Sequence, residues 1–262
     1  MKKLMLGTAV AVLASSVATA QDYQFEVGAG YVTGDIEGTD YDSFGLNARA
    51  HLDRVDTSKG PLNEASFIDK SSFVNLAWVT LDPDVASADS LDAFDLSGRF
   101  VTGENLIIEA RYLDGEFVMF GLPADDTVMS IGVGTYLQDD MDVVVTYQNY
   151  DDADFSSLSA DLHGINKLEG ETSLAFDLGL AYIDAFDETG YGLSAGADYY
   201  LDKSMSFGAG IGLISIDEFD QSTIDVRANY FVTPVVRLGL SYETLGQDAD
   251  GDAIELNAAM RF

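Results

Sequence analysis

The chain has 262 residues, of which 45 are acidic and 13 are lysine or arginine, so its formal net charge is −32 at pH 7. An excess of acid on this scale argues against nucleic acid as a partner. The sequence contains no cysteine, which excludes a disulfide framework.

The first twenty residues have the three parts of a secretory signal peptide. Lys2 and Lys3 form a charged start, residues 4–13 are apolar, and Ala18–Ala20 is a small-residue cleavage pattern. The apolar run is too short to span a membrane. We therefore expect residues 1–20 to be removed during export. Residues 21–262 are expected to form one domain, since about 240 residues suit one closed barrel better than two domains.

From residue 22 onward, apolar and polar residues alternate with a period of two. In the first segment Tyr23, Phe25 and Val27 share one face, while Gln24 and Glu26 lie on the other. Successive side chains of a strand point to opposite faces, so each segment has an apolar and a polar face. The pattern recurs in segments 22–32, 43–52, 74–78, 94–100, 106–112, 129–133, 143–147, 158–162, 174–182, 191–201, 205–213, 224–232, 236–243 and 254–262.

The connections between these segments alternate in character. Short turns at Gly103, Asp139, Gly170, Asp202 and Pro234 alternate with longer acidic stretches. This pattern is typical of a transmembrane antiparallel up-and-down β-barrel, for which we expect about 14 strands, with about 12 or 16 as alternatives. The stretch 114–122 is interpreted as a long or bulged continuation of the fifth strand rather than a separate hairpin.

A secreted β-sandwich would also show alternating strands. Three features favour the membrane barrel. The apolar faces are rich in leucine, valine and aromatic residues, and the aromatics gather toward the strand ends, as interfacial girdles do. The opposite faces hold glycine, serine, asparagine and charged residues, which suits a wet lumen. Only closure lets strands pair all their backbone groups in lipid. No transmembrane helix is expected, because no later segment has the roughly 18 consecutive apolar residues that one needs.

Charged residues on the polar faces are the candidate pore lining. The arginines on these faces are Arg49, Arg99, Arg111, Arg227, Arg237 and Arg261, and the acids include Glu26, Glu109, Asp177, Asp198 and Glu255. Opposed rings of charge across a water-filled pore create a transverse field that orients polar solutes. The alternative interpretation is that these residues pair as salt bridges that fill a narrow, closed barrel.

A second set of acids lies between the strands and is expected at the external end. Its members are Asp35, Asp40, Asp82, Asp84, Asp151, Asp152, Asp217 and Asp220. They would form a negative mouth that draws in cations, or a solvated surface that binds divalent ions bridging lipid. The run Asp248–Asp252 resembles the start of a calcium loop but lacks the rest of the pattern, so no metal site is predicted.

The stretch 53–71 is too long for an ordinary turn. We hypothesise that it folds partly into the lumen and narrows it, with Glu64 and Lys70 as candidate constriction residues. The alternative is a cap on the periplasmic side.

The same stretch carries a family resemblance. Residues 55–67, which include Pro61-Leu62-Asn63-Glu64-Ala65-Ser66-Phe67, resemble a segment of the porin family of proteobacterial outer membranes, with Ser66 in place of an alanine. The C-terminal Phe262 is similar to the sorting signal that the barrel assembly machinery reads. The resemblance implies a passive channel for small hydrophilic solutes in the outer membrane, surrounded by lipid and lipopolysaccharide. It implies no cofactor and no catalytic residue, and it leaves monomer and homotrimer both open.

The sequence gives less support to two other functions. An outer-membrane enzyme needs a nucleophile with an oriented base, but the chain has only His51 and His163 and no G-x-S-x-G motif. A closed barrel that serves as a structural anchor or adhesin is the alternative to the porin, although the external tips are short.

Overall fold

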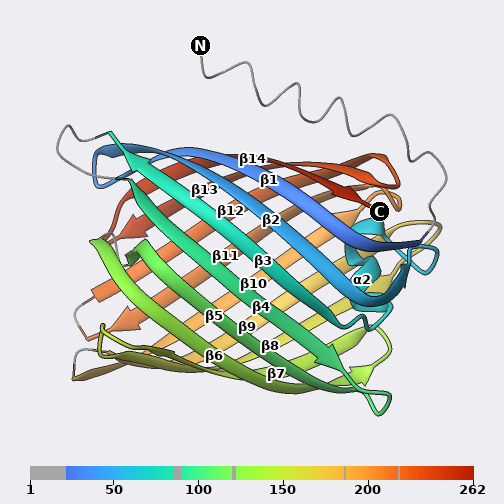
Figure 1. Ribbon diagram of the computed structural model, residues 1–262, viewed down its shortest axis with the longest axis horizontal. Helices are drawn as coiled ribbons and strands as arrows, with labels where there is room; N and C mark the ends of the chain where they lie inside the picture. The colour runs from blue at the N-terminus through green and yellow to red at the C-terminus, as the bar shows by residue number, and fades with distance from the viewer. Residues whose placement is uncertain (1–21, 85–89, 120–121, 186, 218) are drawn as a thin grey trace.

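The computed structural model describes residues 22–84, 90–119, 122–185, 187–217 and 219–262, which form one closed barrel of 14 antiparallel strands (Figure 1). The strands are β1 Asp22–Ile36, β2 Thr39–Asp56, β3 Phe73–Pro83, β4 Leu91–Val101, β5 Leu106–Met119, β6 Leu122–Gln138, β7 Met141–Tyr150, β8 Phe155–Lys167, β9 Ser173–Ala185, β10 Glu188–Tyr200, β11 Met205–Ile216, β12 Phe219–Thr233, β13 Val236–Gln247 and β14 Gly251–Arg261. The predicted fold and strand number are confirmed. The predicted signal peptide, residues 1–20, lies outside the described residues.

Each strand pairs with its neighbours in sequence, and β1 closes the barrel by pairing with β14. Glu26 of β1 lies opposite Arg49 of β2 on one side and Arg261 of β14 on the other. The closure continues to the last residue, because the backbone N–H of Phe262 donates to the carbonyl of Phe25 at 2.8 Å. Pairing all round the wall satisfies the backbone without water. No helix within the described ranges has both the length and the apolar character needed to cross a membrane.

The outer face of the wall is apolar and carries two aromatic bands. One band lies toward the end where the chain terminates, here called the terminal end, and the other toward the opposite end, the loop end. The terminal band consists of Phe25, Phe100, Tyr199, Phe207 and Tyr230, and the loop band of Trp78, Phe94, Tyr112, Tyr147, Tyr182, Tyr191 and Tyr242. Aromatic bands of this kind mark the two membrane–water interfaces.

A charge placed between these bands should destabilise the barrel. Leu180 lies near the middle of β9 and is 58% exposed on the outer face. We expect Leu180→Lys to lower the free energy of unfolding in lipid by about 2–4 kcal/mol, because lysine at the bilayer midplane loses its hydration. Urea unfolding of the barrel in lipid vesicles measures this. Ser194→Lys, which places the same charge on the inner face of β10, is the control. Equal losses in both variants would contradict the assignment of faces.

The strands are longer than the membrane requires. A transmembrane β-strand needs about 9–11 residues, whereas β2 has 18. At the loop end β1 runs to Ile36 and β2 begins at Thr39, so only Glu37 and Gly38 turn there, both with positive φ. The expectation of long acidic loops is therefore wrong here: most of the acidic stretch 33–41 continues the strands above the aromatic band. A second acidic connection was expected over residues 82–92, and its part 85–89 lies outside the described residues.

The stretch 114–122 divides between two strands. Residues through Met119 continue β5, as the sequence indicated, but Leu122 already belongs to β6 and pairs with Met119. Leu122 therefore already runs in the opposite direction to Met119, and residues 120–121 lie outside the described residues. The later strands keep the predicted direction, because this reversal is the one expected between the fifth and sixth strands.

Candidate functional site

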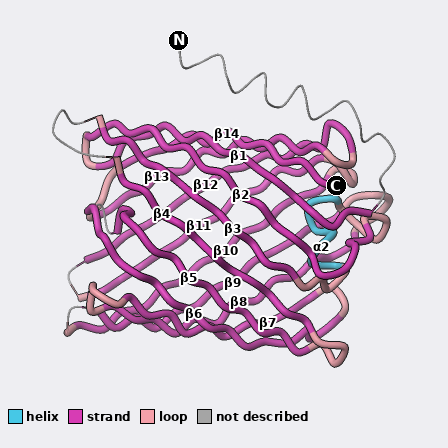
Figure 2. Tube along the Cα trace, in the orientation of Figure 1, coloured by secondary structure: helices cyan, strands magenta, loops and turns pink. Residues whose placement is uncertain are grey.

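A short segment between β2 and β3 enters the barrel at the terminal end. It comprises residues 57–72, here called the plug, and contains the 3₁₀ turn η2 Leu62–Glu64 and the helical turn α2 Ala65–Ile68. Figure 2 shows this helical part at the terminal end, surrounded by strands. The plug begins later than the predicted stretch, because β2 continues through Asp56 and pairs there with β1.

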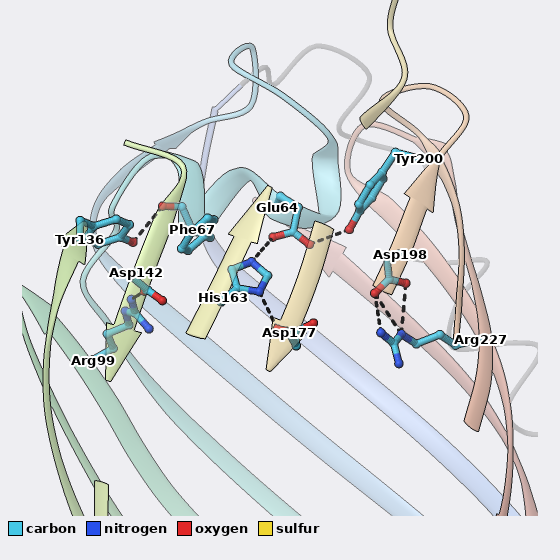
Figure 3. A network of polar contacts seen from close by, with 10 residues as sticks. All are labelled: Glu64, Phe67, Arg99, Tyr136, Asp142, His163, Asp177, Asp198, Tyr200 and Arg227. Atoms are coloured by element: carbon cyan, nitrogen blue, oxygen red, sulfur yellow. Dashed lines mark hydrogen bonds and ion pairs between the residues drawn. The ribbon is translucent and has the colours of Figure 1, made fainter. Parts of the chain in front are cut away.

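Glu64 is the central anchor of the plug. Its side chain is buried and accepts a hydrogen bond from the hydroxyl of Tyr200 on β10 at 2.6 Å. Its other oxygen lies 3.0 Å from Nε2 of His163 on β8, whose Nδ1 lies 2.6 Å from Oδ1 of Asp177 on β9 (Figure 3). One plug carboxylate is therefore tied to strands β8 and β10. His163 is held between two carboxylates, so neither ring nitrogen is left as a base for an incoming substrate.

Further contacts fix the plug to other parts of the wall. Arg237 of β13 donates to Oδ1 of Asn63 at 3.0 Å, and Arg261 of β14 donates to the carbonyl of Leu62 at 2.8 Å. On another side, the hydroxyl of Tyr136 on β6 donates to the carbonyl of Phe67 at 2.9 Å. Strands from β6 to β14 thus hold the plug, which therefore crosses the barrel opening instead of lying along one strand.

Lys70 connects the plug to the turns at the terminal end. Its Nζ donates to Oδ1 of Asn105 at 3.0 Å and lies 2.9 Å from Oδ1 of Asp139. Both partners belong to the tight turns β4–β5 and β6–β7. Lys70 therefore secures the rim of the plug, whereas Glu64 lies deeper among the strands.

The hydrogen bond and charge of Lys70 lower the pKa of Asp139, which lies in a turn outside the strands. A carboxylate with a lowered folded pKa stabilises the fold above its unfolded pKa of about 4, and this contribution is lost as pH falls through the folded value. We therefore expect Lys70→Gln to raise the pKa of Asp139 toward the ordinary value. NMR titration of the Asp139 carboxyl carbon measures the shift, and Lys203→Gln, which alters another turn, is the control. An unchanged pKa in Lys70→Gln would show that this contact is absent in solution.

The six candidate arginines all occupy strand positions whose side chains point inward, and four of them have carboxylate partners. Arg99 on β4 pairs with Glu109 at 2.8 Å and with Asp142 on β7, Arg111 pairs with Asp95, Arg227 pairs with Asp198 at 2.6 Å and Asp225 at 2.7 Å, and Arg261 pairs with Glu26 at 2.6 Å. Each pair joins residues of one strand or of strands at most three apart in the barrel. The charges therefore meet locally instead of facing one another across the lumen.

The pair of Arg227 and Asp198 spans an intervening strand. Arg227 lies on β12 and Asp198 on β10, and both are register partners of Gly208 on β11. A Cβ atom at Gly208 would collide with the carboxylate of Asp198 and with Nε of Arg227. The glycine therefore leaves the space in which this ion pair forms (Figure 3).

Arg49 and Arg237 form no ion pair among the described residues. The guanidinium of Arg49 lies over the ring of Phe73 at 4.3 Å, and that of Arg237 contacts only the neutral Asn63 among the hydrogen bonds of the described chain. Glu255 accepts hydrogen bonds from Ser241 and Asn257 instead of an arginine.

Several partners were missed by sequence analysis. Asp142, Asp225 and Tyr200 have the inward parity, so alternation could have identified their direction. Nothing in the local pattern identified what they contact, because Asp142 meets Arg99 from three strands away and Tyr200 meets Glu64 across 136 residues.

The acids at the loop end have a different setting. Asp35, Asp40, Asp42, Asp82, Asp84 and Asp252 surround a hollow of about 740 Å³ at the rim. Their positions continue the parity of the apolar outer face, and they come from the adjacent strands β14, β1, β2 and β3, so they lie outside the opening on one side of the rim. Among the described residues they take part in no ion pair.

A closed barrel with an apolar band, a polar interior and an internal plug defines the class of outer-membrane channel-type β-barrels. The chain belongs to the family described as "Putative general bacterial porin", which matches it over residues 1–159 and 127–262. This membership places it in the outer membrane, in a family of channels and not of enzymes.

Comparison with solved structures gives the same fold. The outer membrane protein Omp33 of Acinetobacter baumannii has a TM-score of 0.70 and 22% identity, over 93% of this chain and 100% of that chain. A structure described as a bacterial polysaccharide outer membrane secretin has a TM-score of 0.54 and 14% identity, over 93% and 100% of the two chains. No curated protein matches the sequence. At these identities the structures support the fold alone.

Proposed function

We propose that this protein is a channel for passive diffusion of small hydrophilic solutes and ions, with its terminal end in the periplasm and narrowed there by the plug. The observation that carries the proposal is the polar anchoring of the plug across the barrel opening through Glu64, Asn63 and Phe67. Porins of this architecture have short turns on the periplasmic side, which orients the terminal end inward. Arg237 and Arg261 would line this constriction, because both contact the plug.

The same proposal includes a preference for cations. Four inward arginines are neutralised by neighbouring carboxylates, whereas the acids around the loop end have no cationic partner among the described residues. A rim of unpaired negative charge raises the local concentration of cations and the rate at which they enter. This effect should weaken as salt screens the rim.

Planar-bilayer recording of the refolded protein tests both parts. Stable discrete conductance steps would establish the channel, and the reversal potential in a salt gradient gives the sign of selectivity. Arg227→Ala, which removes the charge beside Asp198 and Asp225, should strengthen the cation preference. Heat-modifiable gel mobility reports whether the protein is folded. If folded protein showed no conductance, the result would instead support a closed barrel that serves as an anchor.

A further inference from the structure

The terminal end of the lumen holds an excess of guanidinium groups. Arg49, Arg237 and Arg261 all interact electrostatically with the carboxylate of Glu26. Glu26 forms its ion pair with Arg261 at 2.6 Å, and Glu255 is the other carboxylate that acts on Arg237. Three cations therefore face two anions, in a chain whose net charge is −32.

Two of these arginines have donors without partners. The Nε–H groups of Arg49 and Arg237 are buried and form no hydrogen bond within the described structure. Buried polar groups in folded proteins are almost always paired, and an unpaired donor on a cationic group costs more than one on a neutral group. Both residues remain partly exposed and lie at inward-facing positions of their strands.

The plug supplies only neutral acceptors to this cluster. Arg237 donates to the amide oxygen of Asn63, and Arg261 donates to the carbonyl oxygen of Leu62. A guanidinium binds a carboxylate or phosphate more strongly than a neutral oxygen, because the opposite charges attract and the anion can accept two parallel hydrogen bonds. An anion with two or more oxygens would therefore compete well with Asn63 for Arg237, and it could also reach Arg49.

We infer that Arg49, Arg237 and Arg261 form a binding site for an oxyanion, the carboxylate or phosphate group of a small solute, beside the plug at the terminal end of the lumen. The planar fork of arginine matches both groups in two-point contacts. This inference rests on the proposed function, since a solute must enter the lumen to reach the site. Glu26 keeps Arg261 in place, while Arg49 and Arg237 provide the free charge.

Calorimetric titration of the folded barrel in neutral detergent micelles tests the site. Sodium acetate and inorganic phosphate are the two probes, at constant chloride and pH. Binding of either probe supports the site and identifies the preferred group. We expect Arg49→Gln with Arg237→Gln to weaken binding at least about tenfold, because each removes a charge-assisted contact. Arg54→Gln removes the same charge from an exposed position of β2 and should leave binding unchanged.

A second variant keeps the test decisive if the double variant fails to fold. Asn63→Asp places a carboxylate within reach of Arg237, so it should occupy the site from within the chain and weaken binding of the added anion. The inference would be overturned if the original protein bound neither probe, or if Arg49→Gln and Asn63→Asp both bound the probe as tightly as the original protein. The titration measures binding without conduction. If the bilayer recording showed no conductance while the titration showed binding, the proposed channel would be rejected and the proposed binding site would be supported.

Discussion

Replacing residues 58–70 by a short glycine–serine linker should raise the single-channel conductance severalfold. The narrowest section dominates the resistance of a pore, and the plug crosses the opening between strands β6 and β14. The barrel itself should survive, because Leu52 already pairs with Ser72 beyond the end of the β2–β3 ladder. Planar-bilayer recording measures the change, and heat-modifiable gel mobility reports whether the barrel is folded.

Glu64→Ala is the matched variant for this experiment. It keeps the length of the plug but removes the acceptor that Tyr200 and His163 share. Loss of this anchor should produce brief openings to the conductance of the deletion variant, because the plug then leaves its position only part of the time. If the deletion variant is folded and conducts no better than the original protein, the plug does not limit flow.

The second large effect should come from Arg99. Arg99→Leu leaves Asp142 without its cation, and the Asp142 side chain is only 3% exposed. Breaking a buried ion pair by removing one partner typically costs about 3–5 kcal/mol, because the remaining charge is uncompensated. We expect a loss of this size in the free energy of unfolding, measured by urea titration in lipid vesicles.

Two controls separate this mechanism from a general loss of charge. Arg111→Leu breaks the pair with Asp95, but the Arg111 side chain is 45% exposed, so water compensates Asp95 and the loss should stay below about 1 kcal/mol. Adding Asp142→Asn to Arg99→Leu should recover most of the stability. Equal losses for Arg99→Leu and Arg111→Leu would contradict the difference in burial.

The direction of the candidate lining residues was predictable from the sequence. Strand side chains alternate strictly, so the apolar face of a segment such as 174–182 fixes the direction of Asp177 without knowledge of any other strand. The same local period identified the strand number. The family segment at 55–67 and the interrupted alternation around it also located the plug, although not its boundary at Asp56.

The partners of those residues were decided by the closed barrel. Arg227 meets Asp198 because the register places Gly208 between them, and Arg99 meets Asp142 because three further strands bring β7 beside it. Likewise, no local pattern connects Glu64 with Tyr200. Sequence alone thus determined which side chains face the lumen, since alternation is a property of one strand. Only the tertiary structure decided which of these side chains form ion pairs and which do not, as with Arg49 and Arg237 among the described residues. The reason is that register and closure are properties of all 14 strands together.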